Sequence, residues 1–201
     1  SPTTESAYFL SANRGKRSLT VDISTAEGQG VLRELAMTTD VFVENYKLGD
    51  MKRYGLDYAT LSEANPGLVY CSITGFGQTG PYSQRAGYDF VIQAMGGLMS
   101  ITGQSDDQPG GGAQKCGVPI SDLMTGMYAS VAIVSALFER TRSGQGQYID
   151  MSLLDTQVAW LANQASNYLV SGTTPKRWGN AHPNLAPYQA FAASDGELIV
   201  A

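Results

Sequence analysis

The stretch LVYCSITGF, residues 68–76, decides the fold class of this 201-residue chain, because it is a nearly unbroken run of apolar and small residues. Such a run is typical of a strand that is covered on both faces in a parallel sheet. The segments VFVEN (41–45) and RSLTVDI (17–23) are β-branched or alternating in the same way. Residues 25–39 and 50–66 lie between these runs and carry helical patterns. Strands that alternate with helices predict βαβ units, so we expect an α/β fold.

The rest of the chain continues this alternation. A helix that tolerates its glycines is expected over 86–99, a loop over 102–117, and a helix from Asp122 to about Arg142 that ends at Ser143-Gly144. The strand QYIDMSL (147–153) and a helix over 155–170 follow, and GELIVA (196–201) starts another strand. The chain begins without Met and stops inside that last run, so we expect it to be part of a larger protein.

Composition excludes several classes of protein. The net charge is −5, and hydrophobic residues make up 43% of the chain against 15% charged residues, which is typical of a globular protein and argues against general nucleic-acid binding. No uninterrupted apolar run of roughly 18 residues is present, so we expect no membrane segment. The two cysteines, Cys71 and Cys116, form no CxxC pair, so neither a disulfide framework nor a zinc site is encoded. A reducing cytoplasm or organelle matrix fits best.

Basic residues gather in two short clusters, each bordering a predicted strand. Ligand crevices form outside the carboxyl ends of parallel strands, so two basic clusters there favour a phosphate-bearing ligand. Either cluster alone is more often a solvated surface run. The clusters are Arg14, Lys16 and Arg17, and Lys47, Lys52 and Arg53.

A single carboxylate, Asp122, stands at the start of the apolar stretch PISDLMTGMYASV (119–131). Aspartate is a favoured N-cap because its oxygens accept the free first-turn N–H groups of a helix. The same N–H groups and the helix dipole keep a carboxylate ionised in an apolar cleft, where it can attack an activated carbonyl. The cap and the nucleophile are compatible roles, and this stretch alone leaves both open.

Other motifs are weaker. His182 is the single histidine, and without a G-x-S-x-G elbow or acidic partners at metal-ligand spacing it predicts neither a hydrolase triad nor a metal site. We expect a structural or substrate-lining role for it. The glycine-rich stretches GFGQTGPY (75–82) and PGGGA (109–113) match neither a P-loop nor a dinucleotide fingerprint.

Five stretches, in order and spacing, make the chain resemble the class III CoA-transferase family, which also includes the α-methylacyl-CoA racemases. The resemblance covers nearly all 201 residues, and the tail NYLVSGTTPKRWGNAHPNLAPYQAF (167–191) is most similar to the branch that moves CoA between dicarboxylates such as succinate and glutarate. The five stretches are NRGKRSLTVDI (13–23), TTDVFVENYKLGDMKRYGLDY (38–58), NPGLVYCSITGFGQTGPYSQRAGYDF (65–90), ISDLMTGMYA (120–129) and SGQGQYIDMSLLD (143–155).

The resemblance implies a Rossmann-like parallel sheet flanked by helices, forming a portion of the family's large domain. Residues 1–170 would belong to that CoA-binding and catalytic portion, and residues 171–201 to a linker and the start of a smaller second domain. It further implies that the family's N-terminal strand and helix precede residue 1, and that a glycine-rich loop follows residue 201. The family's members are interlocked homodimers, and CoA is a substrate carrier, with no metal or other cofactor.

The resemblance also assigns site residues. Asp122 would be the nucleophile that carries CoA as an aspartyl thioester, and Asp89 a second catalytic carboxylate, with a helix-start cap as its alternative role. Arg177 and His182 are weaker candidates for lining the substrate, and Arg177 is equally a surface or interface residue. The residues assigned to CoA are Val21, Asp22, Ile23, Ser24, Asn45, Tyr46, Lys47, Arg53, Ala86, Gly87 and Tyr88.

Tyr88 separates the two main activities. The racemases that resemble this chain carry a histidine at this position, which works with the aspartate as a two-base pair. Tyrosine is a poor base at neutral pH, so Tyr88 favours CoA transfer over racemisation. The expected partners are an acyl-CoA and a small carboxylic acid, in the cytoplasm or a mitochondrial matrix. A racemase or a non-catalytic CoA-binding piece remain the alternatives.

Overall fold

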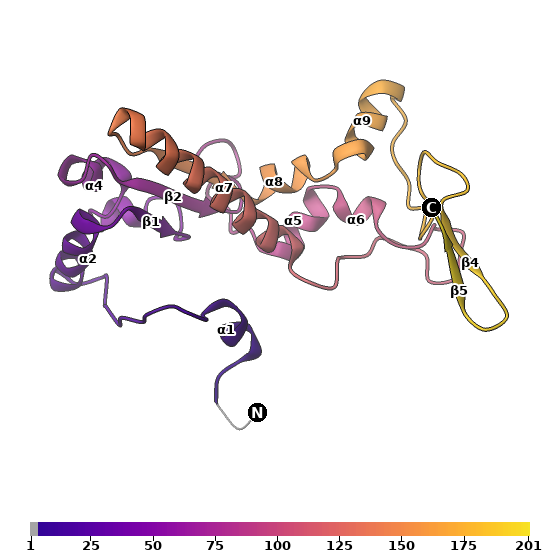
Figure 1. Ribbon diagram of the computed structural model, residues 1–201, viewed down its shortest axis with the longest axis horizontal. Coiled ribbons are helices and arrows are strands. Elements are labelled where there is room, and N and C mark those ends of the chain that lie inside the picture. Colours follow the sequence, from indigo (N-terminus) through magenta and orange to yellow (C-terminus); the bar gives the residue numbers. More distant parts are fainter. Residues whose placement is uncertain (1–3) are drawn as a thin grey trace.

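A parallel sheet of three strands forms the centre of the computed structural model, which describes residues 4–201 (Figure 1). The order is β1-β2-β3, so β2 is the middle strand. Val41 pairs with Val69, and Tyr70 pairs with Tyr148. The strands are β1 (Val41–Glu44), β2 (Val69–Thr74) and β3 (Tyr148–Ser152). The expected α/β fold with a parallel sheet is confirmed.

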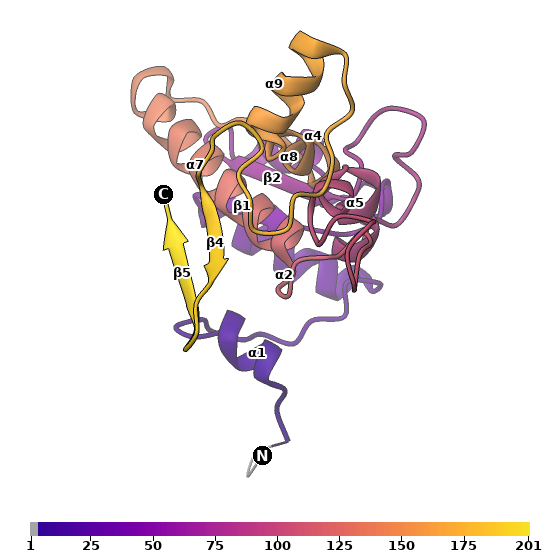
Figure 2. The same cartoon turned by 90° about the vertical axis from the view of Figure 1, so that its right-hand side faces the viewer.

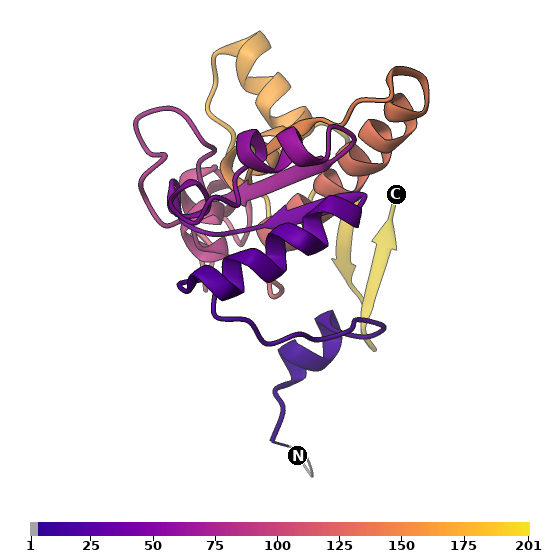
Figure 3. The ribbon, with the colours of Figure 1, turned by 90° about the vertical axis from the view of Figure 1, so that its left-hand side faces the viewer.

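The core lies where α2 and α4 meet the sheet beside β1 and β2 (Figure 3). Tyr70 is buried at its centre, and its hydroxyl donates to the carbonyl of Leu56 at 3.1 Å. The Phe42 ring stacks on the Tyr70 ring with centroids 5.1 Å apart. A buried tyrosine needs such a hydrogen bond, because an unpaired hydroxyl in the core costs about 1–3 kcal/mol.

Helices precede and follow each strand. Apart from α1, which was not predicted, the helices up to residue 101 overlap the predicted helical segments, and the loop at 102–117 contains neither helix nor strand. The helices are α1 (Ala7–Ala12), α2 (Ala26–Thr38), α3 (Asp50–Arg53), α4 (Tyr58–Ala64), α5 (Asp89–Met95), α6 (Leu98–Ile101), α7 (Ile120–Ser143), α8 (Leu153–Ala159) and α9 (Ala162–Ser171).

The prediction of a strand over residues 17–23 is wrong. These residues form no ladder with β1, β2 or β3 and lie on the segment that joins α1 to α2, away from the sheet (Figure 1). Alternation alone cannot make a strand, because its N–H and C=O groups need a neighbouring strand as partner. The basic cluster at 14–17 is therefore not at a strand end, and it is exposed.

Two predicted helices are each divided in two. The segment 86–99 becomes α5 and α6, which are separated by Gly96 and by Gly97 with a φ of 86°. The segment 155–170 becomes α8 and α9, and Ala162 at the break has a φ of 44°. A left-handed backbone cannot continue a right-handed helix, so each break changes the direction of the chain.

Helix α7 runs along β2 and β3 and contacts α5 and α8 (Figure 1). It ends at Gly144, whose φ of 72° forms the left-handed C-cap that the sequence predicted. Its buried residues are small: Ser121, Thr125, Ala129 and Ala136. By length and composition alone α7 could also cross a membrane, a test that core helices of soluble proteins pass as well.

The last described strands form a separate antiparallel hairpin, β4 (Gln189–Ala192) and β5 (Glu197–Val200). Figure 2 shows these two strands side by side, and in Figure 1 they lie at the opposite end of the molecule from β1 and α2. The strand expected at residues 196–201 is thus present. The beginning of a second domain at residues 171–201 stays a prediction.

Asn65 fixes the end of α2 against the entrance to β2. Its side-chain amide donates to the carbonyl of Ala36 at 2.9 Å and to that of Thr39 at 3.0 Å. Both carbonyls lie in the last turn of a helix or just after it, where no intrahelical donor is available. We expect Asn65→Ala to lower the free energy of unfolding by about 1–3 kcal/mol, measured by urea denaturation. An unchanged midpoint would contradict this role.

Candidate active site at the start of helix α7

The first turn of α7 receives its cap from a different helix. Asp122 is the third residue of α7, and the N-cap position is Pro119, which makes no side-chain cap bond. Instead, Oδ1 of Asp89 accepts hydrogen bonds from the backbone N–H groups of Ser121, at 2.8 Å, and of Asp122, at 3.3 Å. The alternative that Asp122 caps its own helix is therefore wrong, and its carboxylate stays free of that role.

The alternative role of Asp89 as a cap for its own helix is also wrong. Asp89 is the first residue of α5, and the N-cap position there is Tyr88. The Asp89 carboxylate points across to α7, so it caps a helix that begins 31 residues later in the sequence. The two predicted catalytic carboxylates, Asp89 and Asp122, are thereby brought together.

A hydrogen bond from Gln93 also holds the Asp89 carboxylate in place. Its Oδ2 accepts from Nε2 of Gln93 at 2.6 Å, and Oε1 of Gln93 accepts from the backbone N–H of Cys116 at 2.8 Å. Gln93 is fully buried. The end of the loop at 102–117 is thus tied through Gln93 to the carboxylate that caps α7.

A second polar pair lies behind the same helix turn. The hydroxyl of Ser121 donates to Oε1 of Gln157 at 2.6 Å. One turn later the Thr125 hydroxyl meets the Thr156 hydroxyl at 2.7 Å. All four side chains are buried, so these hydrogen bonds fix the distance between α7 and α8.

Asp122 itself is solvent-accessible, and no side chain or backbone group of residues 4–201 donates to its carboxylate. Partial removal from water raises the pKa of Asp122 above its ordinary value, and the nearby charge of Asp89 raises it further. A carboxylate that accepts no hydrogen bond from the protein keeps its oxygens available to attack an electrophile. The arrangement thus offers one held carboxylate, Asp89, and one free carboxylate, Asp122.

The raised pKa of Asp122 predicts a stability effect. A carboxyl group whose pKa is higher in the folded state costs stability once pH rises above its unfolded value of about 4. We therefore expect Asp122→Asn to raise the thermal midpoint at pH 7, with the gain disappearing below about pH 4. Thermal unfolding of both proteins across this range tests the sign. A lower midpoint at pH 7 would contradict the raised pKa.

The segment 86–88 is placed at the carboxyl edge of the sheet by two glycines. Gly75 directly follows β2, and a Cβ built on Gly87 would lie 2.3 Å from the Gly75 Cα. The two backbones can approach this closely only because neither residue has a side chain. Ala86, Gly87 and Tyr88 therefore lie beside the end of β2, and Asp89 follows them into α5. The Tyr88 side chain is 72% exposed.

The segment 21–24 forms a tight turn before α2. Oδ1 of Asp22 accepts hydrogen bonds from the backbone N–H of Ser24 at 2.9 Å and from its hydroxyl at 2.6 Å. Both bonds lower the pKa of Asp22, the one from the hydroxyl more than the one from the backbone. A Cβ on Gly28 would meet the Asp22 carbonyl at 1.9 Å, so this turn lies directly on the first turn of α2. Val21 and Ile23 lie in the same turn.

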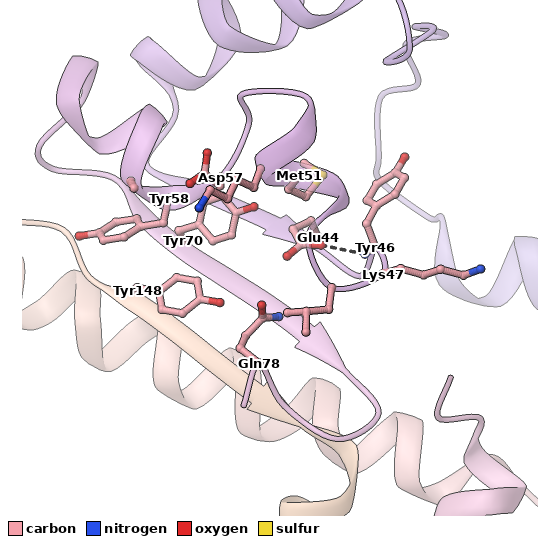
Figure 4. Close-up of a pocket in the computed structure, with 13 residues that line it drawn as sticks. Glu44, Tyr46, Lys47, Met51, Asp57, Tyr58, Tyr70, Gln78 and Tyr148 are labelled. Carbon is pink, nitrogen blue, oxygen red and sulfur yellow. Dashed lines mark hydrogen bonds between the residues drawn. The ribbon is translucent and has the colours of Figure 1, made fainter. Parts of the chain in front are cut away.

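Residues 45–47 directly follow β1, beside a pocket of about 320 Å³ whose lining does not include Asn45 (Figure 4). Tyr46 and Lys47 line this pocket, and the backbone N–H of Tyr46 donates to Glu44 at 2.7 Å, as the dashed line shows. Arg53, at the end of α3, pairs with Asp50 at 3.2 Å and is mostly exposed.

Three tyrosines form the inner wall of this pocket. Tyr58 and Tyr148 stack with ring centroids 5.5 Å apart, and Tyr70 lies beside both (Figure 4). Burial raises the pKa of Tyr70 and of Tyr148, so both hydroxyls stay protonated at neutral pH. The sequence analysis did not predict this wall, because it depends on the register of β2 and β3, which places Tyr70 beside Tyr148.

Among residues 4–201, the side chains of Arg177 and His182 make their hydrogen bonds to groups other than Asp89 and Asp122. The Arg177 guanidinium donates to the carbonyls of Ser100 and Gln104 and pairs with Asp106. His182 Nδ1 accepts from two backbone N–H groups, at positions 184 and 185. Both side chains hold loops together, and a contact with substrate stays a prediction for each.

A parallel sheet covered by helices, with residues 45–47 and 86–88 at its carboxyl edge and a carboxylate pair at one helix start, defines a Rossmann-like α/β domain. The chain belongs to CoA-transferase family III, whose family model matches residues 1–201. The predicted family is confirmed.

Curated and solved relatives agree with this assignment. The chain is 54% identical over 195 residues to the succinate–glutarate CoA-transferase of Agrobacterium fabrum, covering 97% of this chain and 48% of the relative. It is 48% identical to the succinyl-CoA:glutarate CoA-transferase of Homo sapiens, covering 98% and 44%. A crystal structure of a CaiB/BaiF family protein from Brucella suis matches with a TM-score of 0.88 and 56% identity, covering 97% and 50%. The chain thus spans about half the length of the relatives it matches.

Proposed function

We propose that the protein transfers CoA from an acyl-CoA, such as succinyl-CoA, to a free dicarboxylic acid, with Asp122 as the covalent carrier. The observation that carries this proposal is the unequal state of the two carboxylates. Asp89 accepts three hydrogen bonds, whereas the Asp122 carboxylate accepts none from residues 4–201 and stays open to solvent. A nucleophile has to be free in this way, and a structural carboxylate does not.

The reaction divides one exchange into four acyl transfers. Asp122 attacks the thioester carbonyl of the donor, giving a mixed anhydride and CoA thiolate. The thiolate then attacks the Asp122 carbonyl carbon, which releases the donor acid and leaves CoA on Asp122 as a thioester. The acceptor carboxylate attacks that thioester, forming a second anhydride, and the thiolate attacks its acyl carbon and frees Asp122. Each tetrahedral intermediate needs N–H donors for its oxyanion.

The ligand class is supported by the placement of the CoA segments and by the relatives. Residues 45–47 follow the end of β1, and residues 86–88 lie beside the end of β2, so both segments are at the carboxyl edge, where α/β domains bind their ligands. The Agrobacterium and human relatives are named for succinate and glutarate, two dicarboxylates. Tyr88 supports transfer over racemisation, because a two-base mechanism needs a base at this position. A homodimer, as in the family resemblance, is part of the same proposal.

The test uses the protein at its natural length. It is incubated with succinyl-CoA and a panel of free dicarboxylic acids, and new acyl-CoA species are followed by mass spectrometry. Transfer to at least one acceptor, with release of succinate, is the expected result. Absence of transfer together with exchange of the α-proton of a 2-methylacyl-CoA for deuterium would instead establish a racemase. Tight CoA binding with neither reaction would establish a binding protein without catalysis.

A further inference from the structure

Two buried glutamines flank the first turn of α7, and neither belongs to the residues assigned to CoA or to covalent chemistry. Gln93 on α5 is 0% exposed, and Gln157 on α8 is 3% exposed. Glutamine is rarely buried to this extent, because its amide loses water and must find hydrogen bonds inside the protein. A pair of such residues on the same helix turn calls for an explanation beyond packing.

Gln93 joins three parts of the chain. It donates to Oδ2 of Asp89 at 2.6 Å while accepting from the backbone N–H of Cys116 at 2.8 Å. With Oδ2 held in this way, Oδ1 of Asp89 faces the N–H groups of Ser121 and Asp122. An apolar side chain of the same length could fill the space, but it could not orient the Asp89 carboxylate.

Gln157 acts on the opposite side of the same turn. Its Oε1 accepts from the Ser121 hydroxyl at 2.6 Å, while its Nε2 has no hydrogen-bond partner among residues 4–201. The side chain passes over the end of α5, where a Cβ on Gly96 would lie 2.5 Å from the Gln157 Cγ. Gly96 therefore leaves the room that Gln157 needs to reach Ser121.

We propose that Gln93 and Gln157 are positioning residues for Asp122, which hold the first turn of α7 from two sides through Asp89 and Ser121. This inference rests on the proposed function, since it gives both side chains a role in the reaction of Asp122. A nucleophile must approach its carbonyl at about 3 Å with the correct angle, and displacement by about 1 Å can cost roughly 100-fold in rate. The glutamines supply that precision without touching the substrate.

The principal test compares three matched substitutions in the protein at its natural length. Gln93→Met and Gln157→Met keep the length of the side chain and remove its hydrogen bonds. We expect each to lower kcat for CoA transfer by about 10- to 100-fold while KM for succinyl-CoA changes by less than about threefold. The control, Gln145→Met, lies beyond the other end of α7, is exposed and should leave both constants unchanged. Unchanged kcat in both buried variants would overturn the proposal.

Gln93→Glu provides a signature that a merely structural role would not give. As a carboxylate the new side chain repels Asp89, but once protonated its O–H can again donate to Oδ2 of Asp89. Two other charged residues bond to the partners of Gln93: the N–H of Asp122 donates to Asp89, and the Nζ of Lys115 donates to the Cys116 carbonyl. We expect the activity of Gln93→Glu relative to wild type to recover between about pH 8 and pH 5, whereas the ratio for Gln93→Met stays flat. Equal profiles would contradict the role of the amide donor.

A third measurement separates this inference from the proposed function. Ser121→Ala removes only the bond to Gln157, and circular dichroism shows whether each variant is folded at the assay temperature. Amide hydrogen exchange at residues 121 and 122 should accelerate in Gln93→Met and Ser121→Ala but not in Gln145→Met. This readout needs no enzymatic activity, so wild-type inactivity would remove the proposed function alone. Unchanged exchange in both variants would remove the positioning role.

Discussion

Replacing Asp122 by asparagine is expected to reduce CoA transfer at least about 1,000-fold, because a neutral amide cannot form the anhydride and thioester of the proposed mechanism. Asparagine has nearly the same shape, and the backbone N–H of Asp122 keeps its bond to Asp89. Folding and CoA binding should therefore persist. The measurement is the rate of acyl-CoA exchange by mass spectrometry, with CoA binding followed by calorimetry.

The control for this experiment is Asp155→Asn. Asp155 is an exposed carboxylate in the first turn of α8, as Asp122 is in the first turn of α7, but its turn is capped by Ser152. It should retain nearly full activity. If Asp122→Asn kept more than about a tenth of the wild-type rate, the covalent role would have to pass to another group, of which Asp89 is the nearest.

Replacing Gly87 by alanine is the change with the largest expected effect on stability. The new methyl group would lie 2.3 Å from the Cα of Gly75 and 3.3 Å from the Ile92 side chain. Backbone cannot give way as a flexible side chain can, so the strand end and the segment before α5 must separate. We expect a loss of about 3 kcal/mol or more in the free energy of unfolding, measured by urea denaturation. Activity should fall too, because Asp89 directly follows this contact.

Gly126→Ala is the matched control for Gly87→Ala. Gly126 lies inside α7, and a Cβ there would meet nothing within 4 Å. Alanine favours a helix over glycine by about 1 kcal/mol, so this variant should be more stable than wild type. If both variants changed stability in the same direction, the close contact between Gly75 and Gly87 would not be the cause.

The sheet could be predicted because its strands carry their own signals. The runs at 41–45, 68–76 and 147–153 are β-branched or apolar, and each became a strand within one to two residues. Residues 17–23 carry a similar pattern and did not, because strand formation also depends on partners that no local pattern reveals. The breaks that divide α5 from α6 and α8 from α9 were missed for another reason: they depend on left-handed backbone angles at Gly97 and Ala162, which the hydrophobic pattern does not show.

The two carboxylates of the candidate site could be named from the sequence, but the contact between them could not. Asp122 and Asp89 could be singled out by position and by resemblance, yet the cap that joins them crosses between helices and has no local signature. The two glutamines sit among apolar residues in the stretches DFVIQAM and DTQVAW. A polar residue on the apolar side of a helix was the available sign, but its partners become known only when the three helices pack.

The cap between helices also bears on the order in which the protein folds. The start of α7 has no cap of its own, and its Asp89 cap comes from 33 residues before Asp122. During synthesis Asp89 leaves the ribosome first, and it can accept the N–H groups of α7 only after residues 120–122 have also emerged. The helix turn that bears Asp122, the proposed nucleophile, is therefore completed only when α5 docks, so a half-folded chain lacks the finished arrangement of the two carboxylates.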